Sequence, residues 1–264
     1  MRVIALDFDG VVCDSRDEVL VVALATFADL RPEARLVRER AARCDQDGFE
    51  PALPGDDPVA LAFEQLMPLG NRAEDFGIAL EAIEGGLCLG DQESYDRFRA
   101  SLDPGSLHHF HDAFYRRRVQ LRTAAPERWA RLHRSYRPFV DRLGCLAAEA
   151  TLALATAKDG ASARRLLARF GVAELFRDDL VLDKEAGEHK TAHLTRIAER
   201  TGRSFAEISF LDDKVNHLEK VAPLGVRGVL AGWGYNTDRE HERAARLGFA
   251  VATFETAEGL LLAP

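Results

Sequence analysis

Short apolar runs that end at polar residues recur along the sequence, and they predict buried strands with chemistry at their tips. The first run, Val3–Leu6, has no polar alternation and stops at Asp7, which is followed by Asp9 and Gly10. Such a run is typical of a central strand in a parallel sheet, because other elements cover both of its faces. Ligands of open α/β sheets bind outside the carboxyl ends of the strands, so we expect Asp7 to act there. The alternative is a turn cluster, since Asp and Gly are ordinary turn residues.

Two later runs end in the same way. Thr151–Ala155 precedes Thr156, and Ile208–Leu211 precedes Asp212 and Asp213. Around them the pattern predicts shorter strands at Leu180–Leu182, Val226–Leu230 and Phe249–Ala252, and helices at Pro138–Ala150, Ala161–Phe170, Lys190–Arg200, Lys214–Ala222, Asp238–Leu247 and Ala257–Leu262. Strands that alternate with helices indicate right-handed βαβ units and a parallel sheet.

The segment of residues 15–136 contains no strand-like run and is predicted to be helical. Asp14 or Ser15 can cap a first helix, whose apolar positions recur at helical spacing as far as Leu30. Further helices are expected at Val59–Met67, Ala73–Ile83, Asp91–Ala100, Pro104–Leu121 and Pro126–Arg134. The fold class is therefore α/β, with a Rossmann-like parallel sheet core of residues 1–14 and 137–264 and an inserted α-helical domain of residues 15–136.

Composition excludes several classes of protein. The net charge of -8 over 264 residues argues against nucleic acid as the main partner, because binding its backbone requires a surplus of Lys and Arg. The four cysteines include no C-x-x-C pair, so neither a zinc site nor a disulfide framework is indicated. No apolar stretch approaches the roughly 18 residues of a membrane span, and the N-terminal run does not resemble a signal peptide. We expect a soluble, cytoplasmic protein without a membrane partner.

Parallel topology brings the strand ends together in one crevice, where four carboxylates meet: Asp7, Asp9, Asp212 and Asp213. Such a group requires a cation, and Mg²⁺ is the common hard ion that prefers oxygen ligands. Thr156 offers a hydroxyl, and the amides that follow it, beginning with Ala157, can form an anion-binding nest. Lys190 adds a positive charge at a helix start. Together these residues predict a phosphate pocket beside a metal.

Two basic clusters in the helical segment have a simpler interpretation. His108, His109 and His111 lack a carboxylate or Cys at a recognised ligand spacing, so we interpret them as solvated or capping residues and not as a metal site. The run Arg116–Arg118 is typical of a solvated helix face, although one of its members could face an anionic substrate.

The motifs resemble those of the haloacid dehalogenase superfamily of phosphohydrolases. Asp7-Phe8-Asp9-Gly10-Val11-Val12 looks like its first motif, Thr156 like the second, Lys190 like the third, and Leu211-Asp212-Asp213-Lys214 like the fourth. The order of the four is more specific than any single motif. The resemblance covers residues 1–14 and about 137–264, and it implies that residues 15–136 form a cap domain.

The resemblance also implies a role for each motif residue. Asp7 would be the nucleophile that becomes an aspartyl-phosphate, and Asp9 the general acid/base. Mg²⁺ would be held by the Asp7 carboxylate, the Asp9 main-chain carbonyl and Asp212, with Asp213 direct or through water. Phosphate would be bound by Thr156, Ala157 and Lys190. The implied substrate is a small phosphorylated metabolite, and the implied enzyme a phosphatase similar to phosphoglycolate phosphatase.

Departures and alternatives accompany this resemblance. Asn216 occupies a position of the fourth motif where a third acidic residue is often found, and Lys184 competes with Lys190 for the third motif. We prefer Lys190, because it begins a helix. The alternative functions are a phosphomutase with the same core and a non-catalytic binding module that kept the fold.

Overall fold

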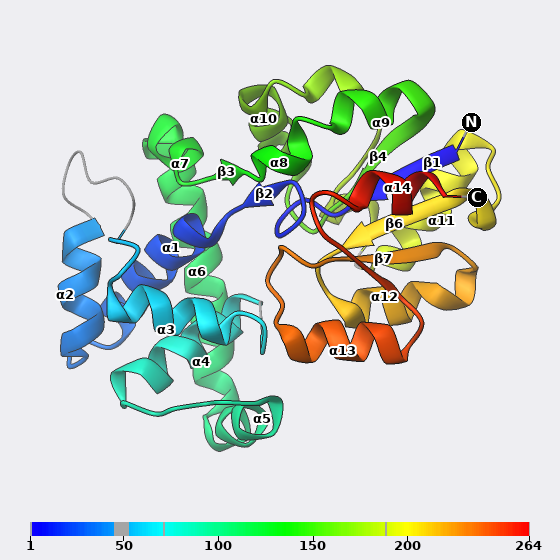
Figure 1. Cartoon of the computed structure of the whole chain (residues 1–264). Coiled ribbons are helices and arrows are strands. Elements are labelled where there is room, and N and C mark those ends of the chain that lie inside the picture. Colours follow the sequence, from blue (N-terminus) through cyan, green and yellow to red (C-terminus); the bar gives the residue numbers. More distant parts are fainter. Residues whose placement is uncertain (1, 45–52, 71, 188, 264) are drawn as a thin grey trace. The chain divides into compact units, whose positions relative to one another are not determined.

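The computed structural model describes residues 2–44, 53–70, 72–187 and 189–263. The chain divides into two compact units (Figure 1). Met1–Asp14 and Arg134–Pro264 form the first, which we call the α/β unit, and Ser15–His133 form the second, the helical unit.

A six-stranded, all-parallel sheet forms the centre of the α/β unit, in the order β5-β4-β1-β6-β7-β8. Its strands are β1 (Arg2–Leu6), β4 (Ala150–Ala155), β5 (Phe176–Leu182), β6 (Ile208–Asp212), β7 (Arg227–Ala231) and β8 (Ala250–Ala252). Strand β1 lies between β4 and β6, and Leu6 pairs with both Leu154 and Leu211. The carboxyl ends of these three strands are therefore neighbours. The predicted α/β class with a parallel core is confirmed.

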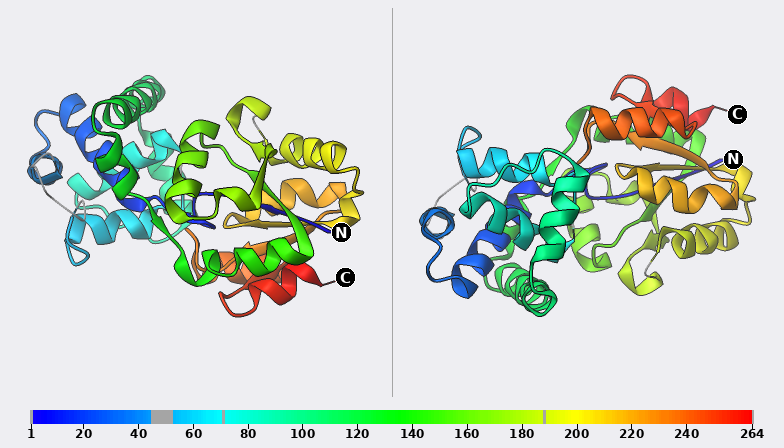
Figure 2. Two further views of the ribbon diagram at one scale, coloured as in Figure 1. Left: turned by 90° about the horizontal axis from the view of Figure 1, so that it is seen from above. Right: turned by 90° about the horizontal axis from the view of Figure 1, so that it is seen from below.

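Helices cover both faces of this sheet (Figure 2). One face packs against α11 (Lys190–Thr201), α12 (Val215–Val221) and α13 (Asp238–Arg246), and the other against α9 (Leu143–Glu149) and α14 (Ala257–Leu262). The unit also contains α8 (Arg137–Val140) and α10 (Gly160–Phe170). Burial on both faces explains why β1 and β6 are largely apolar without alternation. The exception in β6 is Ser209, whose buried hydroxyl donates to the Leu261 carbonyl at 2.8 Å.

The helical unit consists of α1 (Arg16–Leu30), α2 (Arg35–Cys44), α3 (Pro58–Leu66), α4 (Ala73–Glu84), α5 (Gln92–Ser101), α6 (Pro104–Ala124) and α7 (Pro126–Arg131). Local chemistry explains several helix starts. Asp57 accepts hydrogen bonds from the amides of Val59 and Ala60 at the start of α3, and Asp91 accepts one from Ser94 at the start of α5. The core of the unit is rich in aromatic rings: Phe27, Phe63, Phe76, Phe110 and Phe114.

The sequence pattern did not predict α2, because charged residues dominate this segment. Its buried positions, Val37, Ala41 and Cys44, nevertheless follow helical spacing and form one narrow apolar stripe. Strand β5 begins at Phe176 and not at the predicted Leu180. It is an edge strand whose residues Arg177–Asp179 are exposed, so they show no apolar signal.

Two short strands mark the boundary between the units. Strand β2 (Cys13–Asp14) pairs antiparallel with β3 (Arg134–Ser135). The helix predicted to reach Arg134 ends at Arg131, because Arg134 itself is the first residue of β3. The boundary lies between His133 and Arg134, three residues before the one expected between residues 136 and 137. No helix in the described part of the chain has the length and apolar character needed to cross a membrane.

Candidate active site

Asp7 directly follows β1 and is buried, with 8% of its surface exposed. Its Oδ1 accepts hydrogen bonds from the amide of Phe8 at 2.7 Å and from Nζ of Lys190 at 2.6 Å. The chain then turns tightly, because the Phe8 carbonyl accepts the amides of Val12 and Cys13, each at 2.9 Å. The backbone thus directs the Asp7 carboxylate toward elements that follow other strands.

Gly10 is required in this turn for two reasons. Its φ of 84° lies in the left-handed region, and a Cβ there would lie 2.4 Å from Oδ2 of Asp213. The first and fourth motifs, which are about 200 residues apart in the sequence, therefore approach each other closely.

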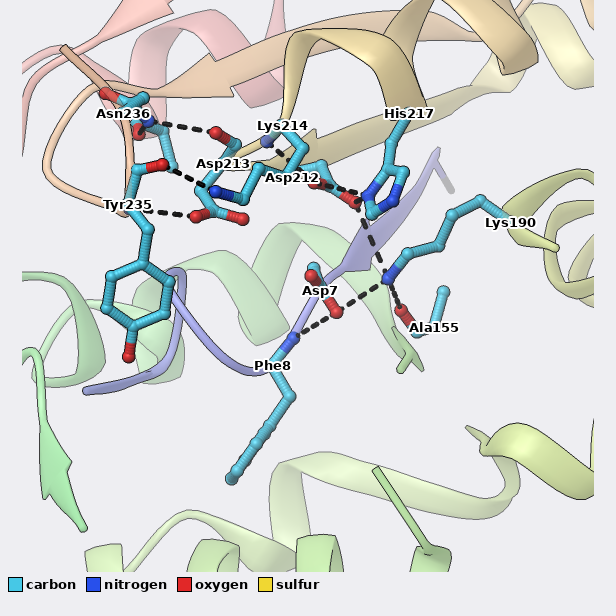
Figure 3. A network of polar contacts seen from close by, with 11 residues as sticks. Asp7, Phe8, Ala155, Lys190, Asp212, Asp213, Lys214, His217, Tyr235 and Asn236 are labelled. Atoms are coloured by element: carbon cyan, nitrogen blue, oxygen red, sulfur yellow. Dashed lines mark hydrogen bonds and ion pairs between the residues drawn. The ribbon is translucent and has the colours of Figure 1, made fainter. Parts of the chain in front are cut away.

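Lys190 opens α11 and is also buried. Its Nζ donates to the Ala155 carbonyl at 2.6 Å and lies 3.5 Å from Oδ2 of Asp212. One ammonium thus joins the ends of β1, β4 and β6, as Figure 3 shows. Burial acts to lower the pKa of Lys190, but the carboxylates of Asp7 and Asp212 prevail and raise it.

Asp212, the last residue of β6, is fully buried. Its Oδ1 accepts the Lys214 amide at 2.9 Å, which fixes the start of α12. Nδ1 of His217 lies 3.0 Å from both oxygens of the same carboxylate. Burial acts to raise the pKa of Asp212, but His217 and Lys190 prevail and hold it at about 2.

Asp213 is bound by the loop that follows β7. Its Oδ2 accepts the Tyr235 amide at 2.8 Å, and its carbonyl accepts Nδ2 of Asn236 at 3.0 Å (Figure 3). Nζ of Lys214 donates to the Tyr235 carbonyl at 2.7 Å. A Cβ at Gly234 would lie 2.3 Å from Cβ of Asp213, so only glycine allows this approach. Burial raises the pKa of Asp213, against the opposing charge of Lys214.

The remaining predicted residues lie at the ends of β1 and β4. Thr156 is buried, and its Oγ1 accepts the amide of Lys158 at 3.0 Å; Ala157 between them is exposed. Nζ of Lys158 lies 3.2 Å from Oδ1 of Asp9. The candidate acid/base is thus ion-paired with a lysine from the loop of the second motif.

The site fits a divalent cation by the chemistry of its donors. Asp7, Asp212 and His217 each offer a ligand atom, and these atoms lie within 4.8 Å of one another. Burial raises the pKa of Asp7 to about 7, although Lys190 opposes this shift. Without a metal the cluster therefore tends to retain a proton on Asp7, and a cation in contact with that carboxylate would relieve the same excess of buried negative charge.

In the structure Lys190 contacts both Asp7 and Asp212. The side chain of Asp213 packs against the backbone of Gly10, three residues after Asp7. The side chain of Lys184 lies outside the described residues. Sequence reasoning missed His217, Lys158 and the loop after β7. His217 follows the fourth motif by about one helical turn, and Lys158 is two residues after Thr156. Their closeness to these motifs in the sequence could have marked both as candidate site residues.

The basic clusters of the helical unit have local partners. His108 and His111 both contact Asp112, at 3.5 and 3.1 Å, on an exposed face of α6. Arg118 forms two hydrogen bonds of 2.8 Å with Glu18, which is fully buried. Among the described residues, the group that meets the geometry of a three-ligand metal site is Asp7, Asp212 and His217.

Comparison with solved structures shows the same fold in several proteins. A haloacid dehalogenase-like family hydrolase from Streptococcus pneumoniae superposes with a TM-score of 0.65 at 13% identity, covering 98% of this chain and 97% of that chain. A predicted phosphoglycolate phosphatase from Haemophilus somnus gives 0.60 at 16% identity, covering 97% and 96%. A predicted phosphatase from Clostridium acetobutylicum gives 0.59 at 12% identity, covering 99% and 98%.

Sequence comparison identifies the family. No curated protein matches the chain. Residues 1–220 match the family model described as haloacid dehalogenase-like hydrolase, and this range includes all four motifs, the whole helical unit and the α/β unit as far as residue 220. The chain therefore belongs to the haloacid dehalogenase-like hydrolases.

Proposed function

We propose that this protein is a Mg²⁺-dependent phosphohydrolase that cleaves a small phosphorylated metabolite through an aspartyl-phosphate on Asp7. The observation that carries the proposal is the contact of Lys190 with Asp7 at the shared ends of three strands, 2.6 Å from Nζ to Oδ1. A buried carboxylate held by a lysine at the tip of a parallel strand is positioned to attack a bound phosphate. Membership of the family supports a hydrolase, and structural neighbours described as predicted phosphatases support phosphate esters as the substrate class.

In the first step, an oxygen of Asp7 attacks phosphorus and the ester P–O bond breaks. Asp9 gives its proton to the departing oxygen, so the alcohol leaves neutral. Lys190 and the hydroxyl of Thr156, with the Ala157 amide, would hold phosphate oxygens and meet the charge that develops there. Asp9 favours phosphoryl transfer over dehalogenation, because a halide leaves without a proton.

In the second step, Asp9 removes a proton from water, which attacks the aspartyl-phosphate and releases inorganic phosphate. Nζ of Lys158 lies 3.2 Å from Oδ1 of Asp9, so this lysine helps to hold the Asp9 side chain beside the Asp7 strand end. Oxygen donors of Asp7 and Asp212, with Asp9 through its carbonyl and Asp213 as a further acid, would hold the metal. When bound, the metal neutralises charge between the Asp7 carboxylate and the phosphate.

We also propose that the helical unit is the cap domain that selects the substrate and excludes water, since it is inserted directly after the first motif. A cytoplasmic location agrees with the exposed thiols of Cys88 and Cys145, which a reducing compartment would keep intact.

Hydrolysis of p-nitrophenyl phosphate by the full chain tests the reaction, with and without Mg²⁺ and after chelation. We expect Asp7→Asn to lose at least about 10³-fold in kcat, because the nucleophile is removed. Asp9→Asn should also be inactive, and chelated enzyme should recover activity when Mg²⁺ is restored. The matched control is Asp141→Asn, an exposed acid of the same unit paired with Arg137, which should keep full activity. Equal rates in Asp7→Asn and wild type would refute the nucleophile assignment.

A further inference from the structure

His217 occupies an unusual place beside the acidic residues of the site. It lies in the first turn of α12, and its amide donates to the Lys214 carbonyl at 3.0 Å. The next residue, Leu218, is fully buried in the core, which anchors this turn of the helix against the sheet. The imidazole is therefore placed over the end of β6 by packing that does not depend on its own contacts.

Two roles could explain the contact of His217 with Asp212. In the first, the imidazole only satisfies a buried carboxylate. That carboxylate already accepts the Lys214 amide at 2.9 Å and lies 3.5 Å from the ammonium of Lys190, so it does not lack partners. In the second, the ring nitrogen is a donor to a cation that the carboxylates share.

Geometry favours the second role. Asp7 and His217 come from different elements, yet their ligand atoms and that of Asp212 all lie within 4.8 Å of one another. Nδ1 of His217 lies 3.0 Å from each oxygen of Asp212. A cation that drew these three groups together would replace the hydrogen bond between the imidazole and the carboxylate.

We propose that His217 is a nitrogen ligand of the metal, and that the site therefore binds a divalent transition ion such as Co²⁺ or Mn²⁺ more tightly than it binds the Mg²⁺ of the proposed function. The inference rests on the proposed function only in placing the metal at this site. Mg²⁺ demands near-octahedral oxygen ligation and dehydrates reluctantly. Imidazole ligation favours transition ions, whose affinity for mixed nitrogen and oxygen sites rises along the first row.

Metal binding to the full-length, metal-free protein tests the proposal without substrate. Co²⁺ and Mg²⁺ are titrated separately by calorimetry, and the visible absorption of bound Co²⁺ is recorded. We expect His217→Asn to weaken Co²⁺ binding by at least about 10-fold, to change Mg²⁺ binding much less, and to alter the Co²⁺ spectrum. Asn is the sharper substitution here, because it keeps a hydrogen-bonding group and offers an oxygen donor. His217→Gln provides a second variant with a longer side chain.

Surface histidines are the main competing Co²⁺ ligands, and the matched control removes them. The double variant His108→Asn with His111→Asn eliminates the exposed histidines beside Asp112 in the helical unit. It should keep the wild-type Co²⁺ affinity and spectrum. The proposal is overturned if the His217 variants keep both, or if the double variant loses them.

A measurement on the wild-type protein covers the case in which both His217 variants fail to fold. In the Co²⁺-loaded protein, the ring protons of a ligating histidine shift far outside the ordinary proton range of the NMR spectrum, and the absence of such signals would overturn the proposal.

Failure of the proposed function would appear in a different measurement. In that case Asp7→Asn and wild type would show the same hydrolysis, while the binding data for Co²⁺ and Mg²⁺ would be unaffected.

Discussion

Glu18 in the helical unit and Asp212 in the α/β unit are both fully buried carboxylates, but their surroundings differ. Glu18 receives two hydrogen bonds of 2.8 Å from Arg118 and one of 3.3 Å from Nε1 of Trp129. In the same unit, Asp75 accepts the Tyr95 hydroxyl at 2.7 Å and also pairs with Arg99. Each of these acids is neutralised by an arginine nearby.

In the α/β unit, three buried acids lie at neighbouring strand ends: Asp7, Asp212 and Asp213. Lys190 contacts two of them, and the pKa of Asp7 is raised to about 7 in spite of that lysine. Burial of an acid is therefore not by itself a sign of function. A buried acid that is paired with an arginine contributes to the fold. A cluster of buried acids that outnumbers the cationic side chains in contact with it indicates a binding site for a metal or a ligand.

The largest effect on stability is expected at Glu18 in the helical unit. Glu18→Ala should lower the free energy of unfolding by about 3 kcal/mol, because it leaves Arg118 and the Trp129 indole without their buried acceptor. Chemical denaturation monitored by circular dichroism measures the change. The control is Glu93→Ala, whose partner Arg97 is exposed, and which should change stability by less than about 0.5 kcal/mol. Equal stabilities for the two variants would contradict the structural role of Glu18.

A smaller effect, on activity and metal affinity, is expected at the loop that follows β7. Gly234→Ala would place a Cβ 2.3 Å from Cβ of Asp213 and 2.5 Å from the Gly10 carbonyl. The shift of Asp213 should reduce hydrolysis and metal affinity by about 10- to 100-fold, as for other residues that support metal ligands. Steady-state kinetics at several Mg²⁺ concentrations, with metal titration by calorimetry, measure both. Wild-type values in a folded variant would show that the loop does not position Asp213.

The smallest effect is expected at a glycine of the same unit that has no neighbour to displace. A Cβ at Gly144, in α9, would meet no heavy atom within 4 Å. Gly144→Ala should therefore raise stability by about 0.5–1 kcal/mol through the backbone entropy of the unfolded chain, with activity unchanged. Thermal unfolding and the same kinetic assay check this expectation. A loss of stability or of activity in Gly144→Ala would show that α9 cannot accept a methyl group at this position.

Much of the α/β unit could be predicted locally, because its central strands are covered on both faces and are therefore largely apolar. The runs at Val3 and Ile208 show this, and each leads directly into a polar site residue. Helix α2 was missed because most of its surface is charged. The polar start of β5 was missed because an edge strand leaves Arg177–Asp179 in solvent.

Apolar periodicity and motif order are local properties of the chain, so the sequence alone predicts the α/β class, a helical segment after the first motif, and the order of Asp7, Thr156, Lys190 and Asp212. Which of these groups touch depends on how the chain folds in three dimensions. The tertiary structure placed His217 on Asp212, Lys158 on Asp9 and the amide of Tyr235 on Asp213. Contacts of this kind depend on strand order, helix packing and the space left by glycines, and these arise from interactions between distant segments that no local pattern records.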